Sequence, residues 1–239
     1  ITASIDRLEM IAVLISIMLP ALGAIKRSAQ QVLSASNMRQ IGLAIQMYQE
    51  EHDGWFPQTT HGNPNIRQSW IYTLAPYLSD AERVEDPDNP GEMIWEIGPV
   101  RVCPRDPKAE KRMANSASSY MLNEWVAVPH VDPFGRIDED RSYTRRDSLA
   151  KPTETYVLFV GANRWAPSVY NDHTHSRSWN DWSTVTWDIS TDRYGANGSP
   201  QFLDGSSNYL FADGHVEGIQ APTLKKVIDD GVNFSRPPE

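Results

Sequence analysis

The chain has little of several features that define common protein classes. Cys103 is the only cysteine among 239 residues, which excludes an intramolecular disulfide and any zinc site built from cysteines. Lys and Arg total 22 against 31 Asp and Glu, and they are scattered, so the clustered positive charge of a nucleic-acid-binding protein is missing. No Gly-x-Ser-x-Gly elbow, His-Glu-x-x-His pair or phosphate-binding glycine loop occurs. We therefore expect neither a nucleic-acid partner nor an enzyme.

Long apolar runs are scarce too, and the clearest lies near the N terminus. Residues 8–25 read LEMIAVLISIMLPALGAI, in which Glu9 is the only charge. As a helix this segment spans about 27 Å, which is marginal for the hydrocarbon core of a bilayer. Lys26 and Arg27 follow at once and suit an interfacial edge. We expect a helix in a membrane or a filament core, rather than a buried core helix or a retained signal sequence.

Helical periodicity continues beyond the apolar run. Met38, Ile41, Ile45 and Tyr48 recur every three or four residues and predict one amphipathic face. The two segments therefore predict a single long helix. Pro20 removes a backbone hydrogen bond from its apolar half and predicts a kink or a melted stretch there.

The Asp53-Gly54 pair predicts the end of this helix. Residues 70–79 predict a short helix, and the β-branched and aromatic run at 155–162 predicts a strand in the middle of a sheet. Residues 163–202 lack strong periodicity and predict extended loops with short strands. Asp213-Gly214 joins two apolar runs and predicts a hairpin with a type I′ turn.

These segments together predict an α+β fold, in which a long N-terminal helix over residues 1–53 precedes a β-rich head over residues 54–239. Because helix and head have separate periodicities, we expect the head to fold without residues 1–52.

Several motifs follow one another along the chain. They are Leu-Pro-Ala-Leu at 19–22, Asn-Met-Arg-Gln-Ile-Gly at 37–42, Asp-Gly-Trp-Phe-Pro at 53–57, Cys-Pro-Arg-Asp-Pro at 103–107, Ser-Ser-Tyr-Met-Leu-Asn at 118–123 and the hairpin segment at 208–216. In this order the motifs resemble those of pilin-like proteins abundant in planctomycetes, within the type IV pilin and type II secretion pseudopilin superfamily.

The resemblance implies a structural subunit of an extracellular filament, a type IV pilus or a pseudopilus, with helices in its core and heads on its surface. Its implied partners are copies of itself in a helical homopolymer, the inner membrane before assembly, and the pilus or secretion assembly machinery. This role requires no cofactor, although some pseudopilins hold calcium in loops of the head domain.

Two positions depart from the family pattern. The near-N-terminal Glu that helps register a new pilin subunit corresponds to Ala3, and a His that precedes the hairpin corresponds to Leu203. Asp6 and Glu9 are the carboxylates that could replace the missing Glu in assembly. If one of them does, Asp6→Asn or Glu9→Gln lowers filament yield; otherwise both acids are solvated near the helix N terminus. Pro20, where we expect the kink or melted stretch, is the third residue that we expect to matter for assembly.

Metal ligation has two candidate sites. His173 and His175 form an H-x-H pair that could place both rings on one face of a strand, but no third ligand is visible nearby and exposed loop histidines are the simpler interpretation. An irregular calcium site could use acidic residues in turns, either Asp86 with Asp88 or Asp188 with Asp192. The default interpretation is that these turns bind no metal. Asn197 and Asn233 match the short glycosylation pattern.

Two alternatives to a purely structural subunit stay open. One is a membrane-anchored minor pilin or adhesin that binds carbohydrate or surfaces through Trp165, Trp179, Trp182 and Trp187. The other is an anchored hydrolase that uses His173, His175 and their acidic neighbours.

Overall fold

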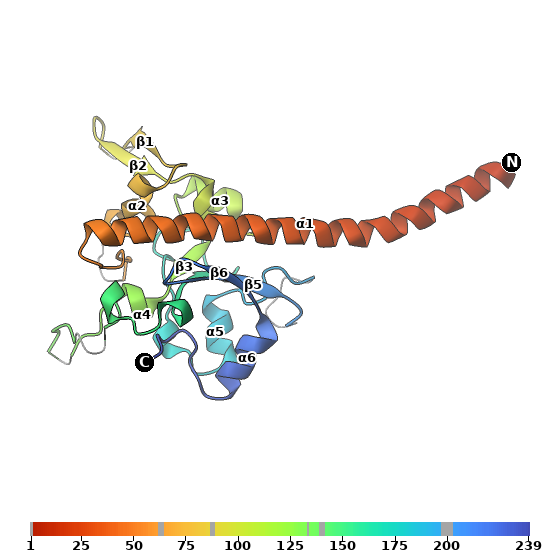
Figure 1. Cartoon of the computed structure of the whole chain (residues 1–239). Helices are drawn as coiled ribbons and strands as arrows, with labels where there is room; N and C mark the ends of the chain where they lie inside the picture. Colours follow the sequence, from red (N-terminus) through yellow and green to blue (C-terminus); the bar gives the residue numbers. More distant parts are fainter. Residues whose placement is uncertain (1, 62–64, 87–88, 133, 139–141, 197–202) are drawn as a thin grey trace.

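The protein has an α+β fold, in which one long helix extends well beyond a β-rich head (Figure 1). This computed structural model describes residues 2–61, 65–86, 89–132, 134–138, 142–196 and 203–239, and the side chains of residues 2–15 and of Ile17 lie outside that description.

Helix α1, Thr2–Glu51, is unbroken through Pro20. The ribbon curves gently toward the N terminus in Figure 1 and shows no interruption, so the predicted melted stretch is wrong. A proline removes one hydrogen bond of the ladder, and the remaining bonds on either side keep the helix continuous. The side chains of Asp6 and Glu9 are outside the described set. Within the part of the chain that the structure describes, no helix has a stretch that is both apolar and long enough to span a bilayer.

Four antiparallel strands form the main sheet in the order β3-β4-β5-β6. Their bounds are Tyr120–Leu122, Tyr156–Val160, Ser206–Phe211 and Val216–Gln220. Strand β4 is interior, which confirms the prediction of a mid-sheet strand. Helix α5, Trp182–Asp188, between β4 and β5, and helix α6, Ala221–Asp229, after β6, lie on the side of the sheet away from α1 (Figure 1).

Strand alternation explains this three-layer arrangement. Leu158 and Leu210 point toward α1 and join its core cluster, whereas Phe159 and Tyr209 join a second cluster with α5 and α6. Because successive side chains of a strand point to opposite faces, one sheet buries apolar groups on both sides.

The remaining elements are short. They are the hairpin β1 (Glu82–Glu85) and β2 (Met93–Glu96), the helices α2 (Trp70–Thr73), α3 (Ala109–Ala114) and α4 (Glu124–Ala127), and 3-10 turns at η1 (Ile66–Gln68), η2 (Ala75–Tyr77), η3 (Pro99–Arg101), η5 (Arg146–Ser148), η6 (Pro152–Glu154) and η7 (Ser176–Ser178). The helix predicted within residues 70–79 is present as α2 and η2.

Short strands are not found among the described residues of segment 163–202, which instead contains η7 and α5. The side chain of Asp181 accepts from the backbone of Thr184, and the Thr184 side chain bonds back to Asp181, which forms a capping box. This local pattern starts a helix where the apolar periodicity alone gave no signal.

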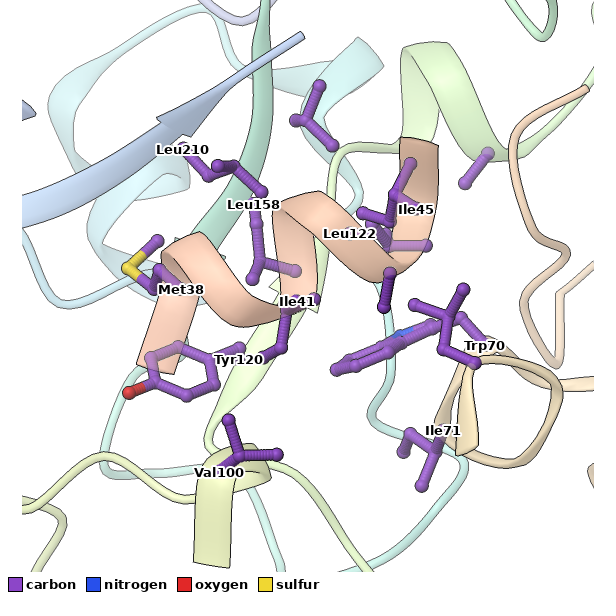
Figure 2. Close-up of a cluster of buried hydrophobic side chains, with 14 of the residues drawn as sticks. Met38, Ile41, Ile45, Trp70, Ile71, Val100, Tyr120, Leu122, Leu158 and Leu210 are labelled. Atoms are coloured by element: carbon purple, nitrogen blue, oxygen red, sulfur yellow. The ribbon is translucent and has the colours of Figure 1, made fainter. Parts of the chain in front are cut away.

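The C-terminal half of α1 belongs to the core of the head. Met38, Ile41 and Ala44 are fully buried, and Figure 2 shows Met38, Ile41 and Ile45 among side chains from the sheet and from α2. Residue 53 therefore lies just beyond the end of the helix, but it is not the edge of the core. This packing argues against the expectation that the head folds without residues 1–52, because deleting them would remove buried side chains from the core.

The hairpin between β5 and β6 has a three-residue loop instead of a type I′ turn. Phe211 N donates to His215 O at 3.0 Å, and Gly214 N donates to Phe211 O at 2.9 Å. Gly214 has φ 93°, whereas Asp213 is not among the described residues with positive φ. A type I′ turn needs positive φ at both central residues, so this loop is a type I turn with a glycine bulge.

Candidate functional site

Three histidines from distant parts of the chain meet on one side of the head. Nδ1 of His61 lies 3.1 Å from Nε2 of His173, and the ring centroids of His173 and His175 are 5.3 Å apart. One ring nitrogen from each of the three lies within 4.8 Å of the others. His173 is buried, while His61 and His175 are exposed. Imidazole nitrogens in such a group are typical ligands of transition metals.

The backbone brings the H-x-H pair beside strand β3. Leu122 N donates to Asp172 O and Thr174 N donates to Leu122 O, both at 2.9 Å, which makes a short parallel bridge around His173. This extended backbone places His173 and His175 on the same side, as the sequence spacing predicted.

Asp172 connects His173 to the loop that carries His61. Its Oδ1 accepts from Nδ1 of His173 at 2.7 Å, and its Oδ2 accepts from the backbone of Thr60 at 2.9 Å and from Ser69 Oγ at 2.5 Å. Asp172 is fully buried, and these bonds satisfy a charge that would otherwise be costly. The residue next to His61 is therefore held by the same carboxylate that orients His173.

Asp188 plays a similar part for His175. Its Oδ2 accepts from the backbone of His175 at 2.7 Å and from Trp179 Nε1 at 2.9 Å, and its Oδ1 lies 3.5 Å from Nδ1 of His175. Each histidine of the H-x-H pair thus has a buried carboxylate on its Nδ1 side.

The electrostatic surroundings of the exposed histidines differ. Burial, followed by the neighbouring His173, lowers the pKa of His61, whereas the hydrogen bond to Asp188 raises the pKa of His175. Glu124 adds negative charge near both rings, and Arg177 adds positive charge near His61. Negative charge therefore predominates around the cluster.

A pocket of about 520 Å³ opens beside His175, with Trp165 and Trp187 in its wall. Trp187 is exposed and Arg164 stacks over its ring. Trp179 is buried in the core, and Trp182 packs against the same cluster. The four tryptophans named as an adhesive face therefore do not share one surface.

The acidic calcium candidates have other partners. Asp86 is buried and forms an ion pair with Arg67, and Asn89 Nδ2 donates to it at 2.9 Å. Asp88 lies outside the described residues. Asp188 bonds to His175 and Trp179, as above. The structure therefore gives Asp86 and Asp188 roles within the protein.

Asp192 is the exception among the acidic residues. It is fully buried, and neither of its carboxylate oxygens has a hydrogen-bond partner among the described residues. Burial, followed by the negative charge of Asp204, raises the pKa of Asp192 to about 6.

Of the two glycosylation candidates, the structure describes only Asn233. Asn197 lies outside the described residues. Nδ2 of Asn233 donates to Ser176 O at 2.7 Å, so a glycan on that nitrogen would break an internal hydrogen bond. In the hairpin turn, Asp213 Oδ1 accepts from Nδ1 of His215 at 2.6 Å.

Sequence reasoning found His173 and His175 but missed His61 and the hydrogen bonds that Asp172 makes to distant residues. His61 is 112 residues away from His173 and lies in a turn-rich segment, so no local spacing connects them. Asp172 adjoins His173 in sequence, but its bonds to Thr60 and Ser69 exist only in the folded chain.

Comparison with known proteins gives one family. The family model SBP_bac_10, described as "Protein of unknown function (DUF1559)", matches residues 24–212. Neither a curated protein nor a solved structure gives a match. The matched segment runs from within α1 to the β5–β6 turn and includes all three histidines of the cluster. Because it spans more than three quarters of the sequence, the chain belongs to the DUF1559 family.

Proposed function

We propose that the chain is a pilin-like structural subunit, in which α1 packs against α1 of neighbouring copies and the heads form the outside of a filament. The observation that carries this proposal is an exposed apolar face along α1. Met18, Leu22 and Ile25 are 56%, 54% and 64% exposed, and Leu43 and Met47 continue the same face beside the head.

The spacing of this face fits one side of a straight helix. An α-helix completes a turn every 3.6 residues, so steps of three and four residues return to one side. Such steps connect Met18, Leu22, Ile25, Ala29, Val32, Ser36, Gln40, Leu43 and Met47. None of these positions is charged, and two small residues, Ala29 and Ser36, permit close approach of a second helix.

The exposed face is opposite to the one that enters the head. Ile41 and Ile45 are buried in the core, and Leu43 lies two residues from each of them, which is about 200° around the helix. In Figure 1, α1 crosses the near side of the head and no other element passes in front of it. The helix therefore has two apolar faces, and only one has a partner within the described chain.

A second copy of this chain is the occupant that best fits the free face. Burying a large aliphatic side chain contributes about 1.5–3 kcal/mol in water, so several such residues per helix favour association between helices. A long N-terminal helix with a β-rich head is also the architecture typical of pilins, which the motif resemblance independently indicates.

Single-cysteine crosslinking tests the proposal. The native Cys103 is fully buried, so an introduced thiol is the only accessible one. We expect Ile25→Cys and Leu43→Cys to form covalent oligomers with a short bifunctional thiol reagent in cells that make the full chain. Electron microscopy of the same samples should show filaments with this chain as the repeating subunit.

Ser183→Cys is the matched control, because Ser183 is exposed on α5, on the far side of the sheet from α1. It should react with a monofunctional label and give far fewer crosslinks. Monomers alone from Ile25→Cys and Leu43→Cys, or equal crosslinking from Ser183→Cys, would refute helix-to-helix packing.

A further inference from the structure

We propose that His61, His173 and His175 bind one divalent transition-metal ion, with Zn²⁺ as the best match. This goes beyond the filament function and does not depend on it. The three nitrogens already lie within 4.8 Å of one another, and the closest pair is 3.1 Å apart. Two ligands of a tetrahedral zinc ion at about 2.0–2.1 Å are separated by roughly 3.3 Å, so the closest pair needs little movement.

The hydrogen bonds fix which nitrogen of His173 faces the ion. The buried carboxylate of Asp172 can only accept, so Nδ1 of His173 carries the proton and Nε2 keeps its lone pair. The Nε2 atom that carries this lone pair lies 3.1 Å from Nδ1 of His61. A carboxylate behind a ligating histidine is the usual outer partner of zinc sites, since it orients the ring and raises its basicity.

Nδ1 of His175 also faces a carboxylate, at a longer distance than in His173. Its Nδ1 lies 3.5 Å from Asp188, which leaves Nε2 free for an ion. The side chain of His175 is 51% exposed and His61 is exposed, so both rings can rotate to close the remaining distance. The two ring partners also supply negative charge, because the carboxylate of Asp172 lies beside His173 and that of Asp188 beside His175.

The donor set selects the type of metal. Three imidazole nitrogens suit Zn²⁺, Cu²⁺ and Ni²⁺, whereas Ca²⁺ and Mg²⁺ prefer oxygen ligands. Since two of the three rings are exposed, a fourth position faces solvent and can hold water or a ligand atom from outside the chain. The ion would also join the loop after α1 to the segment after β4, 112 residues apart at His61 and His173.

Zinc titration of the full chain tests the site. After removal of metal with a chelator, calorimetric titration with Zn²⁺ should give one tight site per chain, and Co²⁺ should give the visible absorption of a tetrahedral centre. Zinc should also raise the melting temperature. His61→Ala and His175→Ala should each weaken zinc binding by at least about 100-fold, and Asp172→Asn by about 10–100-fold.

The control is His215→Ala. His215 also pairs with an aspartate, at 2.6 Å from Asp213, but among the described residues it belongs to no group of three possible metal ligands. Its removal should leave zinc binding unchanged. His173 is buried, so His173→Ala can unfold the protein, and the exposed His61 and His175 carry the test. If no site titrates, or if the site survives His61→Ala with unchanged affinity, the proposal is wrong.

Discussion

The two halves of α1 have the same backbone structure and opposite surroundings. From Ser34 onward the helix buries one face in the head, where Ser34 Oγ bonds to Tyr120 and Asn37 Nδ2 donates to Val102 O. From Met18 to Ile25 its large side chains are exposed. Helical hydrogen bonding is therefore continuous along α1, but only the C-terminal half of the helix contributes to the stability of the head. A continuous element can belong to a core at one end and remain free for assembly at the other.

Truncation should separate the halves most clearly. Deletion of residues 1–52 removes Met38, Ile41, Ala44 and Ile45 from the core. Each large side chain lost costs about 2–5 kcal/mol, against a total stability of about 5–15 kcal/mol for a typical domain. We expect residues 53–239 to lose cooperative thermal unfolding in circular dichroism.

Deletion of residues 1–26 is the matching control, since it retains Gln30, whose Nε2 donates to Pro104 O, and everything after it. This shorter chain should unfold cooperatively, with the head stability of the full chain. A cooperative transition in both truncations would show that the core does not need α1.

A pair of identical substitutions tests the same contrast at single residues. Ile41 is fully buried and Ile25 is 64% exposed. We expect Ile41→Ala to lower the free energy of unfolding by about 2–5 kcal/mol, because it leaves a cavity between α1 and the sheet. Ile25→Ala should change it by no more than about 0.5 kcal/mol while reducing filament yield. Urea denaturation measures the free energy of unfolding of both variants, and equal losses in the two would contradict the comparison.

Glycine substitutions extend the contrast to backbone spacing. A Cβ added at Gly42 would lie 2.8 Å from Cδ1 of Leu210, so Gly42 allows α1 to approach β5 closely. Gly42→Val should therefore destabilise the head by about 1–3 kcal/mol through overpacking. At Gly23 the nearest atom to an added Cβ is the end of the Arg27 side chain at 3.4 Å. Gly23→Val should leave the melting temperature of the head nearly unchanged.

Local chemistry explains which parts of this molecule the sequence could predict. The helix periodicity, the β-branched run of β4 and the Asp-Gly hairpin each depend on neighbouring residues, and all three elements are present. The burial of Gly42 against Leu210 and the meeting of His61 with His173 depend on packing between segments far apart. The predicted melted stretch at Pro20 was wrong because one missing hydrogen bond is small beside a helix of 50 residues.

The partition at residue 53 illustrates the same limit. A change in periodicity marks where a helix ends, whereas a domain is defined by the contacts of its core. Tyr48 shows this, since it lies on α1 yet packs against the core cluster of the head. The periodicity within residues 1–53 indicated that this half of the helix has an apolar face, but it could not reveal that the partner of that face is the sheet face formed by Leu158 and Leu210.

The smallest expected effect concerns the contact between α1 and the hairpin turn. Gly214 has φ 93°, and a Cβ there would lie 2.7 Å from Nε2 of Gln46, which donates to Asp213 O at 3.0 Å. Gly214→Val should cost about 1 kcal/mol, partly from the backbone conformation and partly from the clash with the helix. The double variant Gln46→Ala with Gly214→Val separates these causes, because it removes the clash and retains the strain. We expect the melting temperature to recover only in part relative to Gly214→Val. Full recovery would assign the whole cost to the helix contact, and an unchanged melting temperature in Gly214→Val itself would mean that the turn tolerates a side chain at positive φ.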